Sequence, residues 1–148
     1  MNSSPTMQES IGVLLAAVRT EIVRAMEAEL AAKGLELRYT QFLILKRLSV
    51  LGPMTAGELA RAVELDGGAM TRQLDQLERK GYLRRRPHEQ DRRALRIELT
   101  EQGRALTQEL MNCNDRVLKA AQRSLNEAEQ QQLRDYLARV LHALRDRT

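Results

Sequence analysis

The sequence predicts a mainly α-helical fold that carries one short pair of β-strands. Aromatic residues make up only 3% of the 148 residues and tryptophan is absent, so aliphatic side chains must supply most of the core. Apolar residues recur at spacings of three and four over long stretches, which is the period of a helix face. The period changes to alternation over residues 94–99. At this length, residues 1–148 are expected to form a single domain around one core.

Two helices are expected before the first break in the chain. The first covers residues 8–32 and ends at a capping glycine, Gly34. The second covers residues 40–51 and stops at Gly52 and Pro53. In the first helix the apolar stripe is Ile11, Leu14, Leu15, Val18, Ile22, Met26 and Leu30. In the second, the residues expected to face mostly inward are Phe42, Leu45, Leu48, Val50 and Leu51.

Two shorter helices joined by a tight turn follow. Thr55 and Glu58 have the spacing of a capping box, so a helix is expected to begin at Thr55. The turn at residues 65–68 contains Asp66, which can cap the next helix, and that helix ends near Gly81. The second helix is polar opposite an apolar stripe, an arrangement typical of a helix-turn-helix. The stripe consists of Met70, Leu74 and Leu77.

A β-hairpin is expected directly after these helices. Residues 82–87 and 94–99 each have the pattern of a short strand, with a polar tip at residues 88–93 between them. A hairpin in this place is a wing. We therefore expect residues 38–100 to form a winged helix-turn-helix with a two-stranded β-wing.

Three long apolar stripes lie outside this winged unit, within residues 11–30, 106–117 and 133–144. Helices are expected to begin at Thr100 and Asn126 and to carry the second and third stripes. One small unit cannot cover all three, whereas pairing with a second chain would. We therefore expect residues 8–33 and 101–147 to be dimerisation helices of a homodimer.

The positive charge of the chain is concentrated in one segment. Residues 72–96 contain nine Lys or Arg and four Asp or Glu, a sum of +5, whereas the whole chain carries +4. Most of these cations are arginine, whose planar fork suits phosphate and guanine. The segment indicates a nucleic-acid partner; the alternative is a solvated basic face.

Other classes of function lack their signals. His88 and His142 match no metal-ligand spacing, no Gly-rich phosphate loop occurs, and no nucleophile arrangement is evident, so we expect no enzyme activity, no metal and no cofactor. No apolar run approaches the roughly 20 residues that span a bilayer, and no signal peptide is expected. The single cysteine, Cys113, cannot form an internal disulfide, which favours a reduced, cytoplasmic protein without a membrane partner.

Two motifs resemble those of the multiple antibiotic resistance regulator (MarR) family. Residues 91–103, DRRALRIELTEQG, resemble the wing of that family, and residues 68–77, GAMTRQLDQL, followed by Lys80 and Gly81, resemble its recognition helix. The order of elements over residues 8–145 is similar as well. The resemblance implies a homodimer that binds a palindromic double-stranded DNA operator and releases it when a small, often aromatic and anionic, effector binds.

The expected DNA contacts come from the second helix of the helix-turn-helix and from the wing. Arg72 is the candidate for reading a guanine, although a surface ion pair is the alternative. Gln76 stands where some relatives carry arginine. The resemblance implies that Arg93 enters the minor groove with Asp91 as its brace; the alternative is an ion pair at the hairpin tip. The full expected set is Thr55, Gly68, Ala69, Thr71, Arg72, Gln73, Gln76, Arg84, Arg86, Asp91, Arg92 and Arg93.

The effector is expected where the winged unit meets the dimerisation helices, with Tyr39, Thr71 and Arg85 as candidate contacts. Cys113 is interpreted as a small buried core residue, because the reactive cysteine of the peroxide-sensing branch lies in the first helical region, where this chain has none. A winged-helix module that binds proteins and no longer binds DNA stays open as an alternative function. Salt-dependent binding to duplex DNA would separate the two.

Overall fold

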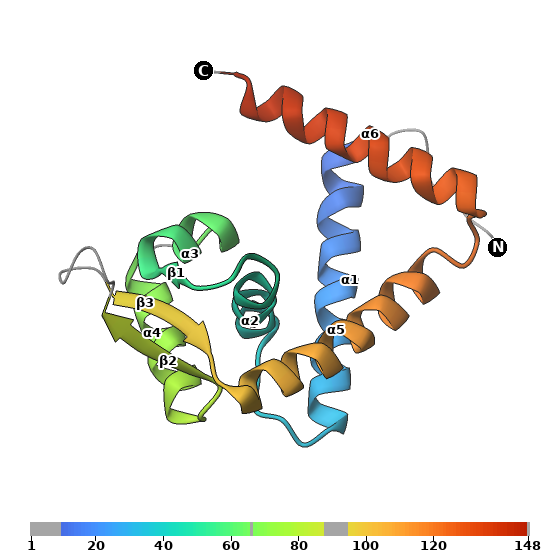
Figure 1. Ribbon diagram of the computed structural model, residues 1–148. Helices are drawn as coiled ribbons and strands as arrows, with labels where there is room; N and C mark the ends of the chain where they lie inside the picture. Colours follow the sequence, from blue (N-terminus) through green and yellow to red (C-terminus); the bar gives the residue numbers. More distant parts are fainter. Residues whose placement is uncertain (1–9, 66, 88–94, 148) are drawn as a thin grey trace.

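The computed structural model describes residues 10–65, 67–87 and 95–147, and it confirms a mainly helical fold (Figure 1). A small sheet lies on one side, next to α4, and the long helices lie on the other. The helices are α1 (Ile11–Ala32), α2 (Tyr39–Leu51), α3 (Ala56–Val63), α4 (Gly67–Arg79), α5 (Glu101–Ala121) and α6 (Glu127–Arg145). The strands are β1 (Met54–Thr55), β2 (Leu83–Pro87) and β3 (Leu95–Leu99).

The helix ends lie where the sequence signals place them. Thr55 caps α3 by accepting a hydrogen bond from the Glu58 N–H at 3.2 Å. Asn126 and Glu129 form a reciprocal capping box at the start of α6. Gly34 follows α1 with a φ of 70°, and the Leu35 N–H reaches back to the Leu30 carbonyl at 3.0 Å, which completes a Schellman-type end. The expected cap at Asp66 lies outside the described residues.

The sheet has one more strand than expected. Its order is β1-β3-β2 and both pairings are antiparallel. Leu83 lies opposite Leu99 and Arg85 opposite Ile97, so the hairpin has the expected register, while Met54 pairs with Ile97 from the other side. The two-stranded prediction missed β1 because two residues after a Gly-Pro break carry no periodicity.

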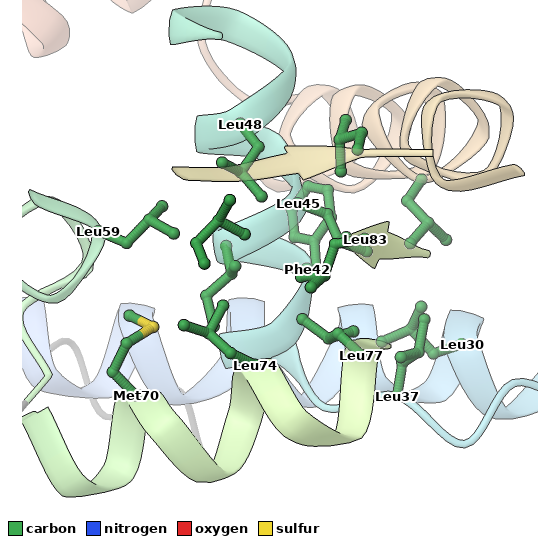
Figure 2. Close-up of a cluster of buried hydrophobic side chains, with 14 of the residues drawn as sticks. Leu30, Leu37, Phe42, Leu45, Leu48, Leu59, Met70, Leu74, Leu77 and Leu83 are labelled. Carbon is green, nitrogen blue, oxygen red and sulfur yellow. The ribbon is translucent and has the colours of Figure 1, made fainter. Parts of the chain in front are cut away.

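The core joins the helix-turn-helix to the sheet (Figure 2). The α4 stripe is buried as predicted and faces α2. Val50 and Leu51, expected to face mostly inward, are instead 59% and 58% exposed. The buried positions of α2 recur at helical spacing as far as Leu48, and the next position of this series is residue 52. Val50 and Leu51 lie between these two positions and therefore face outward. The main buried side chains are Phe42, Leu45, Leu48, Leu59, Met70, Leu74, Leu77, Leu83, Ile97 and Leu99.

The apolar stripe of α5 also differs from the prediction. Leu110 and Cys113 are buried in the core of the same chain, and Leu106 and Val117 are half-buried against it. The reason is that α5 packs across α1 and α2, an arrangement visible for α1 in Figure 1. Residues 106–117 therefore do not need a second chain to cover them.

No helix in the described ranges is long and apolar enough to cross a membrane.

Other apolar residues remain uncovered. The first half of α1 and all of α6 expose large aliphatic side chains, whereas Met26 and Leu30 near the end of α1 are buried. Of the three expected stripes, the third and the first half of the first thus stay exposed in the single chain. The exposed set includes Ile11, Val13, Leu14, Leu15, Val18, Leu133, Leu137, Val140, Leu141 and Leu144.

The junction between the sheet and α5 is tight at Gly103. The Thr100 hydroxyl donates to the Gly81 carbonyl at 2.6 Å and accepts from the Gly103 N–H at 3.0 Å. A Cβ on residue 103 would overlap the carbonyl oxygen of Tyr82. Glycine is therefore required here, and the close approach fixes the start of α5 against the base of the wing.

Candidate nucleic-acid interface

The candidate interface is the outer face of α4 together with β2. Met70, Leu74 and Leu77 on the inner side of α4 are buried, with relative exposures of 0–1%, so their burial fixes which side of the helix faces the core. The opposite side is then turned to solvent. Its exposed residues are Gly67, Gly68, Thr71, Arg72, Asp75, Gln76, Glu78 and Arg79.

Arg72 lies at the centre of this face. No carboxylate within the described ranges forms an ion pair with its guanidinium, so the alternative of a surface ion pair finds no support there. The neighbouring Thr71 hydroxyl donates to the Gly67 carbonyl at 2.9 Å, one turn back. Arg72 is therefore a long, exposed hydrogen-bond donor on this part of α4, and its role as the reader of a base stays a prediction.

The two glutamines predicted to contact DNA have different surroundings. Gln76 is exposed, and its Oε1 accepts a 2.8 Å hydrogen bond from Nε2 of the buried Gln41 on α2. Gln41 Oε1 in turn accepts from the Arg38 N–H at 3.0 Å, so the Gln76 amide is oriented from behind. Gln73 is half-buried, and its Oε1 is buried without a hydrogen-bond partner among the residues described. Gln76 is thus better placed than Gln73 to face a ligand.

Arg85 ties the sheet to α4. Its Nη2 lies 2.8 Å from Asp75 Oδ1 and its Nη1 lies 2.7 Å from Glu78 Oε1, and its side chain is only 22% exposed. Arg85 is one of the three residues expected to contact the effector. In the structure, both terminal nitrogens of the Arg85 guanidinium instead pair with carboxylates on the side of α4.

Arg84 and Arg86 lie on the other face of β2 and share one carboxylate. Each Nε lies 2.6 Å from Glu98 Oε1 on β3. The hydrogen bond from Arg84 lowers the pKa of the Glu98 carboxyl; burial opposes this shift, while the charge of Arg86 reinforces it. Two half-exposed guanidiniums share one negative charge, so the face keeps a net positive charge that suits a phosphate backbone.

The other predicted DNA contacts fall into two groups. Gly68 is exposed at the start of α4, Ala69 is half-buried beside it, and Thr55 is half-buried at the start of α3. Contact of these three residues with DNA stays a prediction. Asp91, Arg92 and Arg93 lie outside the described residues, so their roles stay predictions.

The three predicted effector contacts each have partners of their own. Tyr39 is half-buried at the start of α2, with its ring 6.0 Å from that of Phe42 and 5.8 Å from the Arg19 guanidinium. Thr71 and Arg85 make the contacts described above. Within the described residues, no group of three or more His, Cys, Asp or Glu side chains is placed to hold a metal.

Sequence reasoning missed the residues that support the interface. The sequence did not predict that Asp75 and Glu78 hold Arg85, that Gln41 orients Gln76, or that Glu98 pairs with two arginines. The alternation of Arg84 and Arg86 along one strand was a signal for a shared partner on the next strand. The contact between Gln41 and Gln76 carried no comparable signal.

Comparisons with known proteins agree with this geometry. A sequence model of the MarR family matches residues 37–95, which include α2, the helix-turn-helix and β2. The transcriptional regulator MgrA of Staphylococcus aureus is 32% identical over 111 residues, which cover 75% of this chain and 74% of MgrA.

Solved structures agree over almost the whole chain. Transcriptional regulator PA3341 superposes with a TM-score of 0.83 at 29% identity, covering 93% of this chain and 100% of its own. A mutant MarR from E. coli complexed with operator DNA superposes with a TM-score of 0.79 at 26% identity, covering 88% and 93%. These relatives are regulators and not enzymes, which confirms that part of the sequence prediction. The chain belongs to the MarR family and is a transcriptional regulator with a winged-helix fold.

Proposed function

We propose that this protein binds a palindromic DNA operator as a homodimer, with α4 in the major groove. The observation that carries the proposal is the preorganised face of α4. The apolar side of α4 is buried, Arg85 forms ion pairs with one flank of the helix, and Arg72 extends from its exposed side. A similar protein, the E. coli MarR mutant, was solved in complex with operator DNA.

Each part of the interface has a distinct task in this proposal. Gly67 and Gly68 let the start of α4 approach the groove, where Arg72 donates to a guanine edge. Arg84 and Arg86 contact phosphates, which gives affinity without sequence information. At the wing tip, Arg93 enters the minor groove beside Asp91.

Homodimerisation is supported by the apolar residues that a single chain leaves exposed on α1 and α6. A buried interface between two copies removes these side chains from water, at roughly 25 cal/mol for each Å² of apolar surface. In the dimer, the two α4 helices contact half-sites whose centres lie about one turn of the DNA duplex apart, roughly 34 Å. Such a protein acts where its DNA lies, in the cytoplasm.

Regulation follows the same line. We propose a repressor that leaves its operator when a small, anionic aromatic ligand binds between the winged unit and the dimerisation helices. The ligand acts by favouring a spacing of the two α4 helices that does not match the operator, because it can shift the equilibrium only through different affinity for the two states.

The test is quantitative binding to the duplex upstream of the protein's own coding region, measured at several salt concentrations alongside a scrambled duplex. The proposal predicts one protected palindrome, a dimer by sedimentation, and an affinity for it at least about a thousandfold above the scrambled sequence. Equal affinity for both duplexes, or a well-folded monomer at micromolar concentration, would contradict it.

A further inference from the structure

Two hydrogen bonds connect the start of α2 to the outer face of α4 through the side chain of Gln41. The backbone N–H of Arg38 donates to Gln41 Oε1 at 3.0 Å, and Gln41 Nε2 donates to Gln76 Oε1 at 2.8 Å. Gln41 is 1% exposed, whereas Gln76 is exposed on the face of α4 that also carries Arg72. A buried amide is thus bonded to a side chain of the candidate interface.

The first residue of this relay, Arg38, is held in turn by α1. Glu27 Oε2 on α1 lies 2.8 Å from Arg38 Nε and accepts a hydrogen bond from the Tyr39 N–H at 3.1 Å. Gln41 is the third residue of α2, so its bond to the Arg38 N–H is a helix-capping contact. Contacts with α1 and within α2 therefore fix the place from which the Gln41 amide reaches α4.

The direction of the two hydrogen bonds follows from their chemistry. A backbone N–H can only donate, so the Gln41 atom that faces Arg38 must be Oε1. Gln41 then presents Nε2 to Gln76, which must accept through its own Oε1. Turning the Gln76 amide over would place two N–H groups against each other beside a buried side chain, which disfavours that orientation about tenfold.

The Nε2 amide group is therefore the part of Gln76 that is left for a ligand. Within the described residues it has no hydrogen-bond partner. A glutamine with both ends free pairs with adenine by accepting from the 6-amino group and donating to N7. Gln76 cannot present both ends in this way, because Gln41 occupies its Oε1. It can donate to N7 of a purine, to O6 of guanine or to O4 of thymine.

We propose that Gln41 is a positioning residue for base recognition: it holds Gln76 as a hydrogen-bond donor, so that Gln76 reads only acceptor atoms of the major groove. Gln41 itself touches no DNA and acts through Gln76. The inference rests on the proposed function, because it requires α4 to lie in the major groove. It adds the kind of atom that one position of the recognition face selects.

Base analogues test whether Gln76 only donates. Affinities of the natural protein and of Gln76→Ala for single-base variants of the operator first locate the base pair that Gln76 reads. Each pair carries one amino group in the major groove, on adenine or on cytosine. Unsubstituted purine in place of that adenine, or 2-pyrimidinone in place of that cytosine, removes the group.

Removal of the amino group should change the affinity of the natural protein and of Gln76→Ala by the same factor, because Gln76 accepts no hydrogen bond from DNA. Weakened pairing with the complementary base affects both proteins alike and cancels in the comparison. A loss that is about threefold or more larger for the natural protein would show that Gln76 accepts from the amino group, and it overturns the inference.

Gln41→Met tests the positioning role. Methionine is a flexible, apolar residue that can fill the buried position but cannot maintain the relay. The Gln76 amide can then turn over, so discrimination at the base pair that Gln76 reads should fall by between about twofold and tenfold, with discrimination at other pairs unchanged. In the Gln76→Ala background, Gln41→Met should not alter this discrimination further. Leu45→Met, which changes a buried residue one turn further along α2, is the control and should keep it.

A purely structural role for Gln41 gives a different result. If Gln41→Met leaves the discrimination unchanged, or weakens binding to the operator and to every variant by the same factor, Gln41 does not position Gln76 and the inference is wrong. It is also wrong if Gln76→Ala alters discrimination at no base pair. In each of these cases selective operator binding by the natural protein leaves the proposed function intact, whereas a natural protein that prefers no duplex contradicts both.

Discussion

Arg85 Nη2 on β2 lies 2.8 Å from Asp75 Oδ1 on α4, so the wing and α4 are joined by an ion pair at the flank of the exposed face. The Arg85 side chain is 22% exposed, whereas Arg24 and Glu21 on α1 form a 2.6 Å pair with side chains 69% and 68% exposed. These two pairs share their chemistry and differ in solvent access, so together they provide a matched test.

The first prediction concerns the coupling energy between Arg85 and Asp75. A double-mutant cycle of Arg85→Gln and Asp75→Asn, measured by urea unfolding, should give a coupling of about 0.5–1 kcal/mol. The cycle of Arg24→Gln and Glu21→Gln should give at most about 0.5 kcal/mol, because solvent screens that pair. A coupling for Arg85 and Asp75 no larger than that of the control pair would show that they do not hold the wing.

The second prediction concerns Gly103. Gly103→Ala should lower the free energy of unfolding by about 1–3 kcal/mol, because its Cβ would overlap the Tyr82 carbonyl oxygen and force α5 away from the wing. Gly57→Ala is the control, since its Cβ would lie 3.6 Å from the flexible Arg61 guanidinium and alanine favours a helix. Thermal and urea unfolding measure both. A Gly103→Ala protein as stable as Gly57→Ala would contradict the close approach.

The third prediction is a pH dependence at Glu98. Its pKa lies below the ordinary value of 4.5, chiefly because Arg84 donates a hydrogen bond to the carboxylate. A lowered pKa in the folded state contributes stability above the unfolded pKa, and that contribution is lost as the pH falls through the folded value.

Compared with Glu98→Gln, the natural protein should therefore be more stable by about 1 kcal/mol at pH 7. This difference should shrink as the pH falls below 4.5. Urea unfolding of both proteins along a pH series measures it. A difference that stays constant through the acidic range, or grows there, would show that Arg84 and Arg86 do not stabilise the ionised carboxylate.

Local patterns in the sequence predicted most of the fold. The stripe of Met70, Leu74 and Leu77 identified the buried side of α4, and the capping residues Thr55 and Asn126 marked the starts of two helices. These predictions succeeded because each signal lies within one turn of the feature that it specifies.

Contacts between distant segments were less predictable. The apolar stripe of α5 was assigned to a second chain, yet Leu110 packs inside the same chain, since periodicity shows that a face is buried but not against what. The burial of Cys113 in the core was predicted and is confirmed. The basic segment predicted a cationic surface, but not that Arg85 is held by α4 while Arg84 and Arg86 share Glu98. Such pairings depend on the register between elements.

The fourth prediction concerns the wing tip, which lies outside the described residues. Arg93→Ala should weaken binding to operators with different A·T-rich flanks to a similar degree, because readout in the minor groove is degenerate. Asp91→Ala should produce a milder version of the same defect, since Asp91 is expected to brace Arg93. Tighter operator binding by Asp91→Ala would show that charge alone governs the wing.

The fifth prediction concerns Arg72 and is the central one. Arg79 provides the matched control, because it is an exposed arginine two turns further along α4, with its Nε near the Asp75 carbonyl at 3.4 Å. Arg72→Ala should remove a base contact worth about 1–3 kcal/mol. Arg79→Ala should weaken binding less than Arg72→Ala does, and by about the same amount on every duplex.

The most direct measurement is the affinity of the natural protein, Arg72→Ala and Arg79→Ala for the operator and for its single-base variants. Arg72→Ala should lose affinity on the natural operator and lose its discrimination at one base pair in each half-site, while Arg79→Ala should keep the discrimination at every position. If Arg72→Ala weakens binding to the natural operator and to every variant by the same factor, Arg72 reads no base and α4 is not the recognition helix.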